Sequence, residues 1–494
     1  MSNDSPDNPS ADYEAMKEYW TLASDIMGGA KRMRAAKEKY LPRFEKESDS
    51  EYDNRVETAP FTNLYGDALK NLASKPFSEI LGLEEGADPS FMELEPDIDR
   101  AGNSLHVFAR DVFKNGIKNG LDWIFVDKAS VPGARSRADE AAAGARPYWV
   151  RVPAPSMLAV YSDVVDGETL IVHARFLEEK TVRDGFGERK ITRVRVLERQ
   201  PIIDDQGKTT GYTPARFGLW EEQEDPETKK KVWVEIQNGD IGIGTIALVP
   251  FITGESQGGR FRIKPPLADL ADMQVTEFQL ESNRRRVQDL TAFPIITLGG
   301  VTKPTDGNGQ IALGPRAVLY FPPIGETGAF GKAERIEPSG ASADSLRKDL
   351  AEHRREMREA GMQPLVPQSG TLTATATAVA ESKAQSAAQA WALDLKDALE
   401  QAWAFTAAWL SLDPESAPSV SVFTDFGVGE DSAEHMTVVR DLQRDGGISM
   451  KARVDEAKRR SILGPNYDYE ADKEQIIQEV PGDDDFTSEE SGAI

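Results

Sequence analysis

The sequence predicts a mixed α+β fold, and three stretches of the chain carry this prediction. Near the N-terminus apolar residues recur at three- and four-residue steps, which is typical of amphipathic helices. Across residues 121–251 the period changes to two, with short β-branched and aromatic runs that predict an antiparallel sheet. An alanine-rich run at 374–411 predicts one helix of about 57 Å. A chain of 494 residues with these elements is expected to form about two to four lobes.

The first half of the chain is expected to begin with a disordered segment. Residues 1–12 are rich in Ser, Asp, Asn and Pro and have little to bury. A helix is expected at 13–39, interrupted by the glycines at 28 and 29. Further helices are expected at 63–73 and 104–119, and the small-residue, charged segment at 129–147 is expected to form a mobile loop inserted in the sheet region.

In the second half the helical period returns. The prolines at 265 and 266 suit a helix start, and the helix should end before Pro294. A β-rich stretch follows, and then a helix at 342–360 with five acidic and five basic residues, hence no net charge. A loop at 361–373, with two prolines, two glycines and no charged residue, precedes the long helix. Three shorter helices are expected around 433–445, 449–460 and 469–479, before an acidic tail.

Composition excludes several classes of protein. The net charge of −25 argues against a protein that coats nucleic acid, because such binding relies on Lys and Arg neutralising phosphates. The absence of cysteine excludes a disulfide scaffold, a thiolate metal site and a cysteine nucleophile. We expect no signal peptide and no membrane span, because the N-terminus is polar and acidic and no apolar run is long enough. We therefore expect a soluble protein of a reducing cytoplasm.

No motif predicts catalysis, a cofactor or a metal. The four histidines, at 106, 173, 353 and 435, have no paired spacing that suits a metal or hydrolytic centre. The letters QGKT end like a Walker A motif, but Ile202 stands where the motif needs its first glycine. Strand-like residues flank QGKT on both sides, so a hairpin loop is favoured over a phosphate site. The glycines of GDIGIGTI fail the dinucleotide-binding spacing and are expected in a loop.

The sharpest basic cluster is NRRRVQ at 283–288. One interpretation is a helix end facing solvent or another subunit, where the arginines pair with acids such as Glu281 and Asp289. The other is a contact to phosphate or to a partner protein. The sequence leaves both interpretations open.

Four stretches resemble the portal proteins, or head-to-tail connectors, of tailed double-stranded-DNA bacteriophages. KPPLADLADMQVTEFQLESNRRRVQDLTAFPIITLGG is similar to the first stem helix leading into the clip, and GMQPLVPQSGTLT to the tunnel loop. ATATAVAESKAQSAAQAWALDLKDALEQAW is similar to the long helix that follows the loop. KYLPRFEKESDSEYDNRVETAPFTNLYGDALKNLASKPF resembles the start of the wing. The order of these stretches is more specific than any one of them.

The resemblance implies a phage portal fold with wing, stem, clip and helical crown. It divides the chain into a disordered N-terminus at 1–12, a wing of helices and antiparallel sheet at 13–262, a first stem helix at 263–290, a clip at 291–340, a second stem helix at 341–361, a tunnel loop at 362–373, a long wing helix at 374–412, a crown at 413–480 and an acidic disordered tail at 481–494.

The resemblance also implies a function and partners. About twelve copies would form a ring at one capsid vertex, through which double-stranded DNA passes non-specifically during packaging and ejection. The expected partners are the terminase large subunit at the clip, the major capsid protein and scaffold around the wing, and a head-tail adaptor protein. The protein would lie at the portal vertex of the virion, and in the host cytoplasm during assembly, without membrane contact.

Two sets of residues are candidates for the channel and the subunit contacts. The DNA-facing tunnel loop would comprise Gln363, Pro364, Leu365, Val366, Pro367, Gln368, Ser369, Gly370, Thr371 and Leu372. The stem candidates for channel or subunit contacts are Arg284, Arg285, Arg286, Arg347, Lys348, Arg354 and Arg355. A ring repeats every cation about twelve times, so unpaired channel cations would hold DNA, and balanced stem helices favour sliding. The long helix would support the loop and pack subunit on subunit through its Ala and Trp faces.

Two other classes of protein remain as alternatives. The first is a structural protein of a phage tail or baseplate, or an unrelated helical scaffold. The second is a nucleotide-driven nucleic-acid enzyme that would use QGKT, which the missing glycine and missing helix disfavour. The subunit number in solution separates the first from a portal, and an ATPase assay separates the second.

Overall fold

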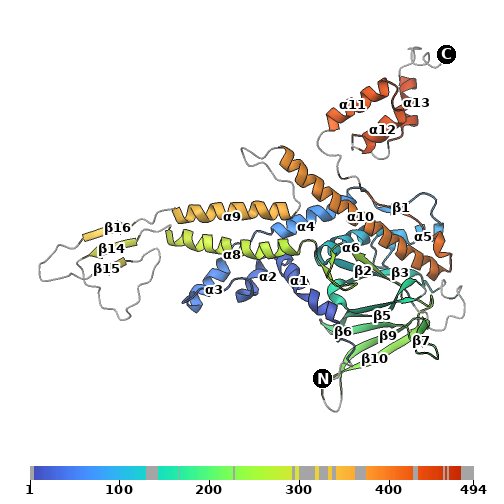
Figure 1. The fold of residues 1–494 in the computed structure, drawn as a ribbon, viewed down its shortest axis with the longest axis horizontal. Coiled ribbons are helices and arrows are strands. Elements are labelled where there is room, and N and C mark those ends of the chain that lie inside the picture. The colour runs from blue at the N-terminus through green and yellow to red at the C-terminus, as the bar shows by residue number, and fades with distance from the viewer. Residues whose placement is uncertain are drawn as a thin grey trace. The chain divides into compact units, whose positions relative to one another are not determined.

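A computed structural model describes most of the chain. The described residues are 5–129, 139, 143–165, 167–225, 229–291, 295–299, 318–321, 332–336, 341–361, 374–424, 426, 432–459, 462–463 and 467–479. The chain divides into two compact units, Met1–Thr424 and Asp425–Ile494. The fold is mixed α+β, as the sequence predicts (Figure 1).

The N-terminal helices follow the predicted pattern with one correction. Helix α1 (Ala11–Met27) begins inside the segment predicted to be disordered through residue 12. Its N-cap Ser10 accepts a hydrogen bond from the Tyr13 N–H, and the Ser10 N–H donates to the Leu158 carbonyl at 2.9 Å. These bonds fix the chain earlier than its composition suggests. The predicted glycine break is confirmed, because Gly29 has φ +68° at the start of α2 (Gly29–Ala35).

Four further elements build the helical part of the first unit. They are α3 (Asp49–Thr58), α4 (Leu64–Ser74), the short α5 (Pro89–Met92) and α6 (Leu105–Asn119). Helices α4 and α6 match the predicted ranges. Helix α3 was not expected, although a capping box marks its start: the Ser48 and Glu51 side chains each accept from the other residue's backbone N–H.

The sheet region is antiparallel, as predicted. One sheet has the order β11-β2-β3, from Leu248–Ile252, Leu121–Lys128 and Pro147–Pro153. A five-stranded sheet has the order β10-β9-β6-β5-β4, from Lys231–Asp240, Arg216–Glu224, Gly187–Glu198, Glu168–Asp184 and Met157–Val165. Most of the segment at 129–147, predicted to be a mobile loop, lies outside the described residues.

Short strand pairs complete the β structure of this part. They are β7 (Pro201–Ile203) with β8 (Thr209–Tyr212), β12 (Glu255–Ser256) with β13 (Ile263–Lys264), and β1 (Gly82–Leu83) with β17 (Val420–Ser421). The β7–β8 pair confirms the predicted hairpin at QGKT. Its turn uses Gly207 at φ +80°, with the Lys208 N–H donating to the Asp204 carboxylate at 2.9 Å.

Two long helices pack against each other, and a small sheet lies between them in the chain order. Helix α8 (Ala268–Thr291) and helix α9 (Ala341–Ala360) lie side by side (Figure 1). Between them come β14 (Ile295–Gly299), β15 (Val318–Phe321) and β16 (Lys332–Ile336). Strand β14 is central, parallel to β15 and antiparallel to β16. The predicted pattern of helix, β-rich stretch and helix is thus confirmed.

Helix α10 (Ala374–Leu410) has 37 residues and matches its predicted range within one residue. Its stripe is buried in the chain's own core: Trp403 is fully buried, with ring centroids 5.5 Å from Phe91 and 4.9 Å from Trp149. The expectation that its tryptophans pack one subunit on the next is therefore wrong for Trp391 and Trp403. Trp403 fills the space against α5 and β3, and Trp391 is buried in the same hydrophobic core.

The second unit contains three short helices, α11 (Ser432–Arg444), α12 (Met450–Arg459) and α13 (Tyr469–Glu479). Their ranges agree with the three predicted helices. The predicted acidic tail at 481–494 lies outside the described residues. Over the part of the chain that the structure describes, no helix combines the length and apolarity that crossing a membrane requires.

Candidate functional site

The candidate site is the α8–α9 pair, which carries all seven predicted stem residues. The ten predicted tunnel-loop residues, 363–372, lie outside the described residues. Helix α8 buries polar side chains where a helix in a core usually buries apolar ones: Gln274, Glu277, Glu281 and Ser282 are all buried. Buried polar groups need partners, so these four residues determine what α8 contacts.

Gln274 joins α8 to the first turn of α4. Its side-chain oxygen accepts from the backbone N–H groups of Leu64 and Tyr65, at 2.9 and 3.1 Å. Its amide nitrogen donates to the Thr62 carbonyl at 2.8 Å and to Glu277 at 3.1 Å. The first N–H groups of a helix have no partner within that helix, so a residue from α8 caps α4.

A cluster of two acids and two arginines holds α9 against α8. Arg354 of α9 donates to Glu277 at 2.5 Å and lies 3.5 Å from Glu281. Arg284, one turn further along α8, donates to Glu281 at 2.6 Å. Burial raises the pKa of Glu277 even though Arg354 opposes the rise. Burial also opposes ionisation of Glu281, but Arg284 and Arg354 outweigh it and lower its pKa.

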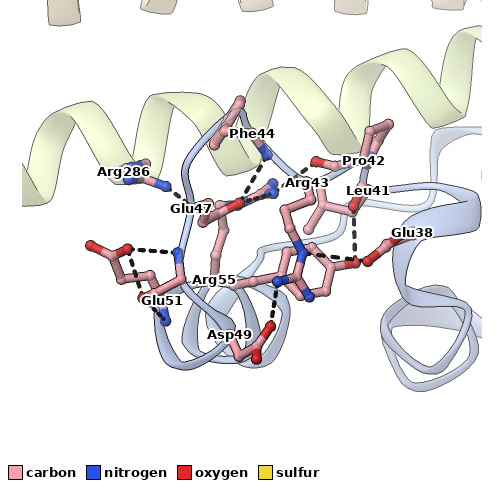
Figure 2. A network of polar contacts seen from close by, with 12 residues as sticks. Glu38, Leu41, Pro42, Arg43, Phe44, Glu47, Asp49, Glu51, Arg55 and Arg286 are labelled. Carbon is pink, nitrogen blue, oxygen red and sulfur yellow. Dashed lines mark hydrogen bonds and ion pairs between the residues drawn. The ribbon is translucent and has the colours of Figure 1, made fainter.

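A second cluster lies where α3 and the loop before it pack against α8 (Figure 2). The side chain of Glu47 is fully buried and accepts two hydrogen bonds from Arg55, both at 2.8 Å. Arg286 of α8 donates to the same carboxylate at 2.7 Å, and the Phe44 N–H donates at 3.1 Å. Burial opposes ionisation of Glu47, but these donors outweigh it and lower its pKa.

The remaining predicted stem residues lie on the surface. Arg347 is 3.2 Å from Asp344, and Arg355 is 3.6 Å from Glu352, so both form ion pairs within α9. Lys348 and Arg285 are exposed. The structure thus brings Arg284 and Arg354 into one cluster and Arg286 into another, and leaves the others apart.

Sequence reasoning found one part of the site and missed another. The predicted pairing of NRRRVQ with Glu281 is confirmed by the Arg284 contact; the side chain of Asp289, the other predicted partner, lies outside the described residues. Glu47 and Gln274 were missed. The Ser48 capping box was the available signal for a helix beside Glu47, whereas no local pattern marks Gln274.

Among the described residues, no group of three or more His, Asp or Glu side chains is placed to hold a metal ion.

Comparisons with known proteins give one family match and weak structural similarities. A protein-family model described as a domain of unknown function (DUF4055) matches residues 266–410, which span α8 to α10. No curated protein matches the chain.

Two solved structures similar to this chain come from gene transfer agent particles. One chain belongs to a structure described as the neck of an empty particle computed with C6 symmetry, with 12% identity, a TM-score of 0.39, and coverage of 80% of this chain and 88% of that one. The other belongs to the virion of a native particle, with 12% identity, a TM-score of 0.38, and coverage of 85% and 97%. Both TM-scores are below 0.5, so these similarities assign no role.

Proposed function

We propose that this chain is a portal protein that forms a ring around double-stranded DNA at one vertex of a phage-like capsid. The observation that carries the proposal is the α8–β14–β15–β16–α9 arrangement followed by the 37-residue α10. Two paired helices with a small sheet between them in the chain correspond to the expected stem and clip. The long helix after a short connection corresponds to the expected wing helix.

The charges of the helix pair support a conduit for DNA. At least five of the seven predicted stem cations have carboxylate partners within 4 Å among the described residues: Arg284, Arg286, Arg347, Arg354 and Arg355. A cation that is already paired gains less from a passing phosphate, and repeating few unpaired cations around a ring keeps DNA mobile. The net charge of −25 acts in the same direction.

The proposal implies no catalysis by this chain. The energy for packaging would come from a separate ATPase that docks at the predicted clip, residues 291–340. The major capsid protein and scaffold would contact the predicted wing, and an adaptor protein would connect the ring to a tail.

The first experiment measures the size of the purified full chain. Mass photometry should find a particle of about 650 kDa, which corresponds to about twelve copies of the 54.3 kDa chain. Negative-stain images viewed end-on should show a central hole. A monomer or trimer at every concentration would contradict the proposal and favour another structural role.

A second experiment concerns the predicted tunnel loop. Deleting residues 364–372 should leave ring assembly intact and reduce DNA packaging or retention in a reconstituted particle. A deletion that abolishes folding of the subunit would mean that this segment is part of the core, and the assignment of the loop would be wrong.

A further inference from the structure

The distal part of the β5–β6 hairpin extends beyond the rest of its sheet. Strand β4 pairs with β5 no further than Phe176, and β9 pairs with β6 only from Arg193 onward. Residues 179–191, which we call the arm, therefore form a two-stranded ribbon with a free edge on each side among the described strands. Eleven of these thirteen residues are exposed, and Phe186 at the turn is fully exposed.

The arm has two properties that favour contact with a second surface. A two-stranded hairpin on its own is only marginally stable in water, so packing against another surface would stabilise it. The arm also carries four basic and three acidic residues, whereas the whole chain has a net charge of −25. A surface that suits the arm combines carboxylates for its basic residues with an aromatic side chain for Phe186.

A groove with these properties lies on the outer face of the same sheet. Phe176 and Leu197 point into the core, so their neighbours Arg175 and Val196 lie on the opposite face, where the groove is. Its lining also includes Glu198, Arg216, Phe217, Gly218, Trp220, Glu235 and Asn238. The groove has a volume of about 490 Å³. Sites for small ligands span about 300–1,000 Å³, so the groove has room for a large side chain.

The two arginines of the groove already have partners. The Arg216 Nε donates to Asp240 at 2.9 Å. Arg175 donates to the Ser5 and Pro6 carbonyls at 3.5 and 3.4 Å, and these two residues form one wall of the groove. Within the described residues, no ion pair joins either arginine to a carboxylate of the groove lining.

The two carboxylates of the lining can therefore accept a basic side chain. Glu198 is half-buried, and its side chain has no hydrogen-bond or ion-pair partner among the residues that the structure describes. Glu235 is exposed and accepts only from the neutral amide of Asn238, at 3.1 Å, in the same part of the chain. Trp220 lies opposite Glu235 on the neighbouring strand, and its ring offers a face to a cation or to a second aromatic ring.

The arm of a chain cannot reach the groove of the same chain. The register of β5 and β6 runs without a shift from His173 to Asp184, so the ribbon continues straight out of the sheet. At about 3.3 Å per residue, its turn lies roughly 30 Å along the strand from Arg175. Any groove of this kind that the arm enters must belong to another molecule.

We propose that the groove receives the arm of a second copy of the chain. The proposal rests on the proposed ring, in which one face of each subunit meets a different face of the next. Glu198 and Glu235 would pair with basic residues of the arm, and Phe186 would pack on Trp220. The contact would join the sheet of each subunit to that of its neighbour around the ring.

The absence of cysteine makes crosslinking a direct test of this contact. Phe186→Cys places a thiol at the turn of the arm, and Asn238→Cys places one at the groove; both positions are exposed. The two single variants, one of them carrying a size tag, should form a mixed disulfide-linked dimer on a non-reducing gel. Ile80→Cys, which is 87% exposed and outside the lining, replaces Asn238→Cys as the control and should give about a tenth of the yield.

Charge reversal gives a second measurement. Mass photometry across a dilution series gives the concentration at which half of the subunits are assembled. Lys180→Glu in the arm and Glu198→Lys in the groove should each raise it about tenfold, because each places like charges together. Lys31→Glu, an equal change at an exposed residue of α2 outside the arm and the groove, should leave it unchanged. Thermal melts at low concentration check that all variants fold.

Three results would overturn this proposal and leave the proposed function standing. The first is a wild-type ring whose mixed disulfide does not exceed the Ile80→Cys control. The second is normal assembly of both charge variants. The third is an equal effect of Lys31→Glu, since assembly would then follow net charge rather than the arm. Weaker assembly of Lys180→Glu without the mixed disulfide would mean that the arm docks elsewhere, and the groove would be the wrong site.

Failure of the proposed function has a different signature. Wild-type protein that stays monomeric at every concentration would contradict the ring. A mixed disulfide above the control would in that case still support docking of the arm in the groove of a second copy, and its absence would overturn both proposals.

Discussion

Helices α10 and α8 both bury one face in the same unit, but with opposite chemistry. Helix α10 buries an almost wholly apolar stripe of Ala, Leu and Trp, whereas α8 buries Gln274, Glu277, Glu281 and Ser282 beside its apolar residues. An apolar face needs only a complementary shape, because the hydrophobic effect has no direction. A polar face needs particular partners at particular distances. The two helices therefore have different requirements for their surroundings.

The difference has a consequence for buried charge. Glu47 and Asp122 both have fully buried side chains, yet their pKa values move in opposite directions. Glu47 has three sources of hydrogen bonds and a lowered pKa, whereas burial raises the pKa of Asp122 to about 7 despite Arg151 at 3.3 Å. One Asp122 oxygen has no hydrogen-bond partner among the described residues. Burial opposes ionisation at both groups; the donors outweigh it and lower the pKa of Glu47, whereas at Asp122 burial outweighs Arg151 and raises the pKa.

The largest expected effect comes from the apolar helix. Trp403→Ala should lower the free energy of unfolding by about 5 kcal/mol, because it leaves a large cavity beside Phe91 and Trp149. Denaturant unfolding followed by circular dichroism measures the change. Leu393→Ala is the control on the same helix, since Leu393 is 49% exposed and should cost less than about 1 kcal/mol. Similar losses in the two variants would show that α10 is not held by its buried stripe.

The second-largest effect is expected from the buried polar cluster around Glu47. Glu47→Ala should cost about 4 kcal/mol, because it leaves the Arg55 guanidinium buried, with a side chain only 6% exposed, without its carboxylate. Replacing both partners, as Glu47→Leu with Arg55→Met, should recover most of this loss in the same unfolding assay. If the double variant is as unstable as the single one, the Glu47–Arg55 pair stabilises the fold by more than the neutralisation of each other's buried charge.

A pH series sharpens the contrast between the two carboxylates. Asp122 keeps its proton in the folded protein up to about pH 7, while the unfolded chain releases it near its ordinary value of 3.8. Its raised pKa therefore lowers stability progressively as pH rises from 4 to 7. Relative to wild type, Asp122→Asn should gain on the order of 3 kcal/mol between pH 5 and pH 8. The opposite trend, or none, would mean that Asp122 is ionised in the fold.

The smallest effect concerns the contact between α8 and α4. Gln274→Leu should cost about 2 kcal/mol, because two buried N–H groups of α4, those of Leu64 and Tyr65, lose their acceptor. Faster hydrogen exchange of these two amides should accompany the loss. Gln279→Leu, which removes only a donor to the Tyr40 carbonyl, should cost less and leave both amides protected.

The same contrast explains how much of the fold and the site was predictable. Helix α10 and the three C-terminal helices match because their apolar residues recur at helical steps over several turns. Helix α3 was missed because it buries only Tyr52 and Val56 as apolar residues, too few for a period. The Arg284 pair with Glu281 follows from three-residue spacing, whereas Arg286 and Glu47 are 239 residues apart and no local pattern joins them. The predicted tunnel loop and the assigned lobes remain predictions.

The Gln274 amide has a mechanical consequence. An α-helix advances about 100° in rotation per residue, so a shift of α8 by a single position would swing this amide away from the end of α4. Rolling or sliding of α8 relative to α4 would therefore break the hydrogen bonds of Gln274 to the Leu64 and Tyr65 N–H groups. A displacement of α8 that keeps both bonds has to move the first turn of α4 with it.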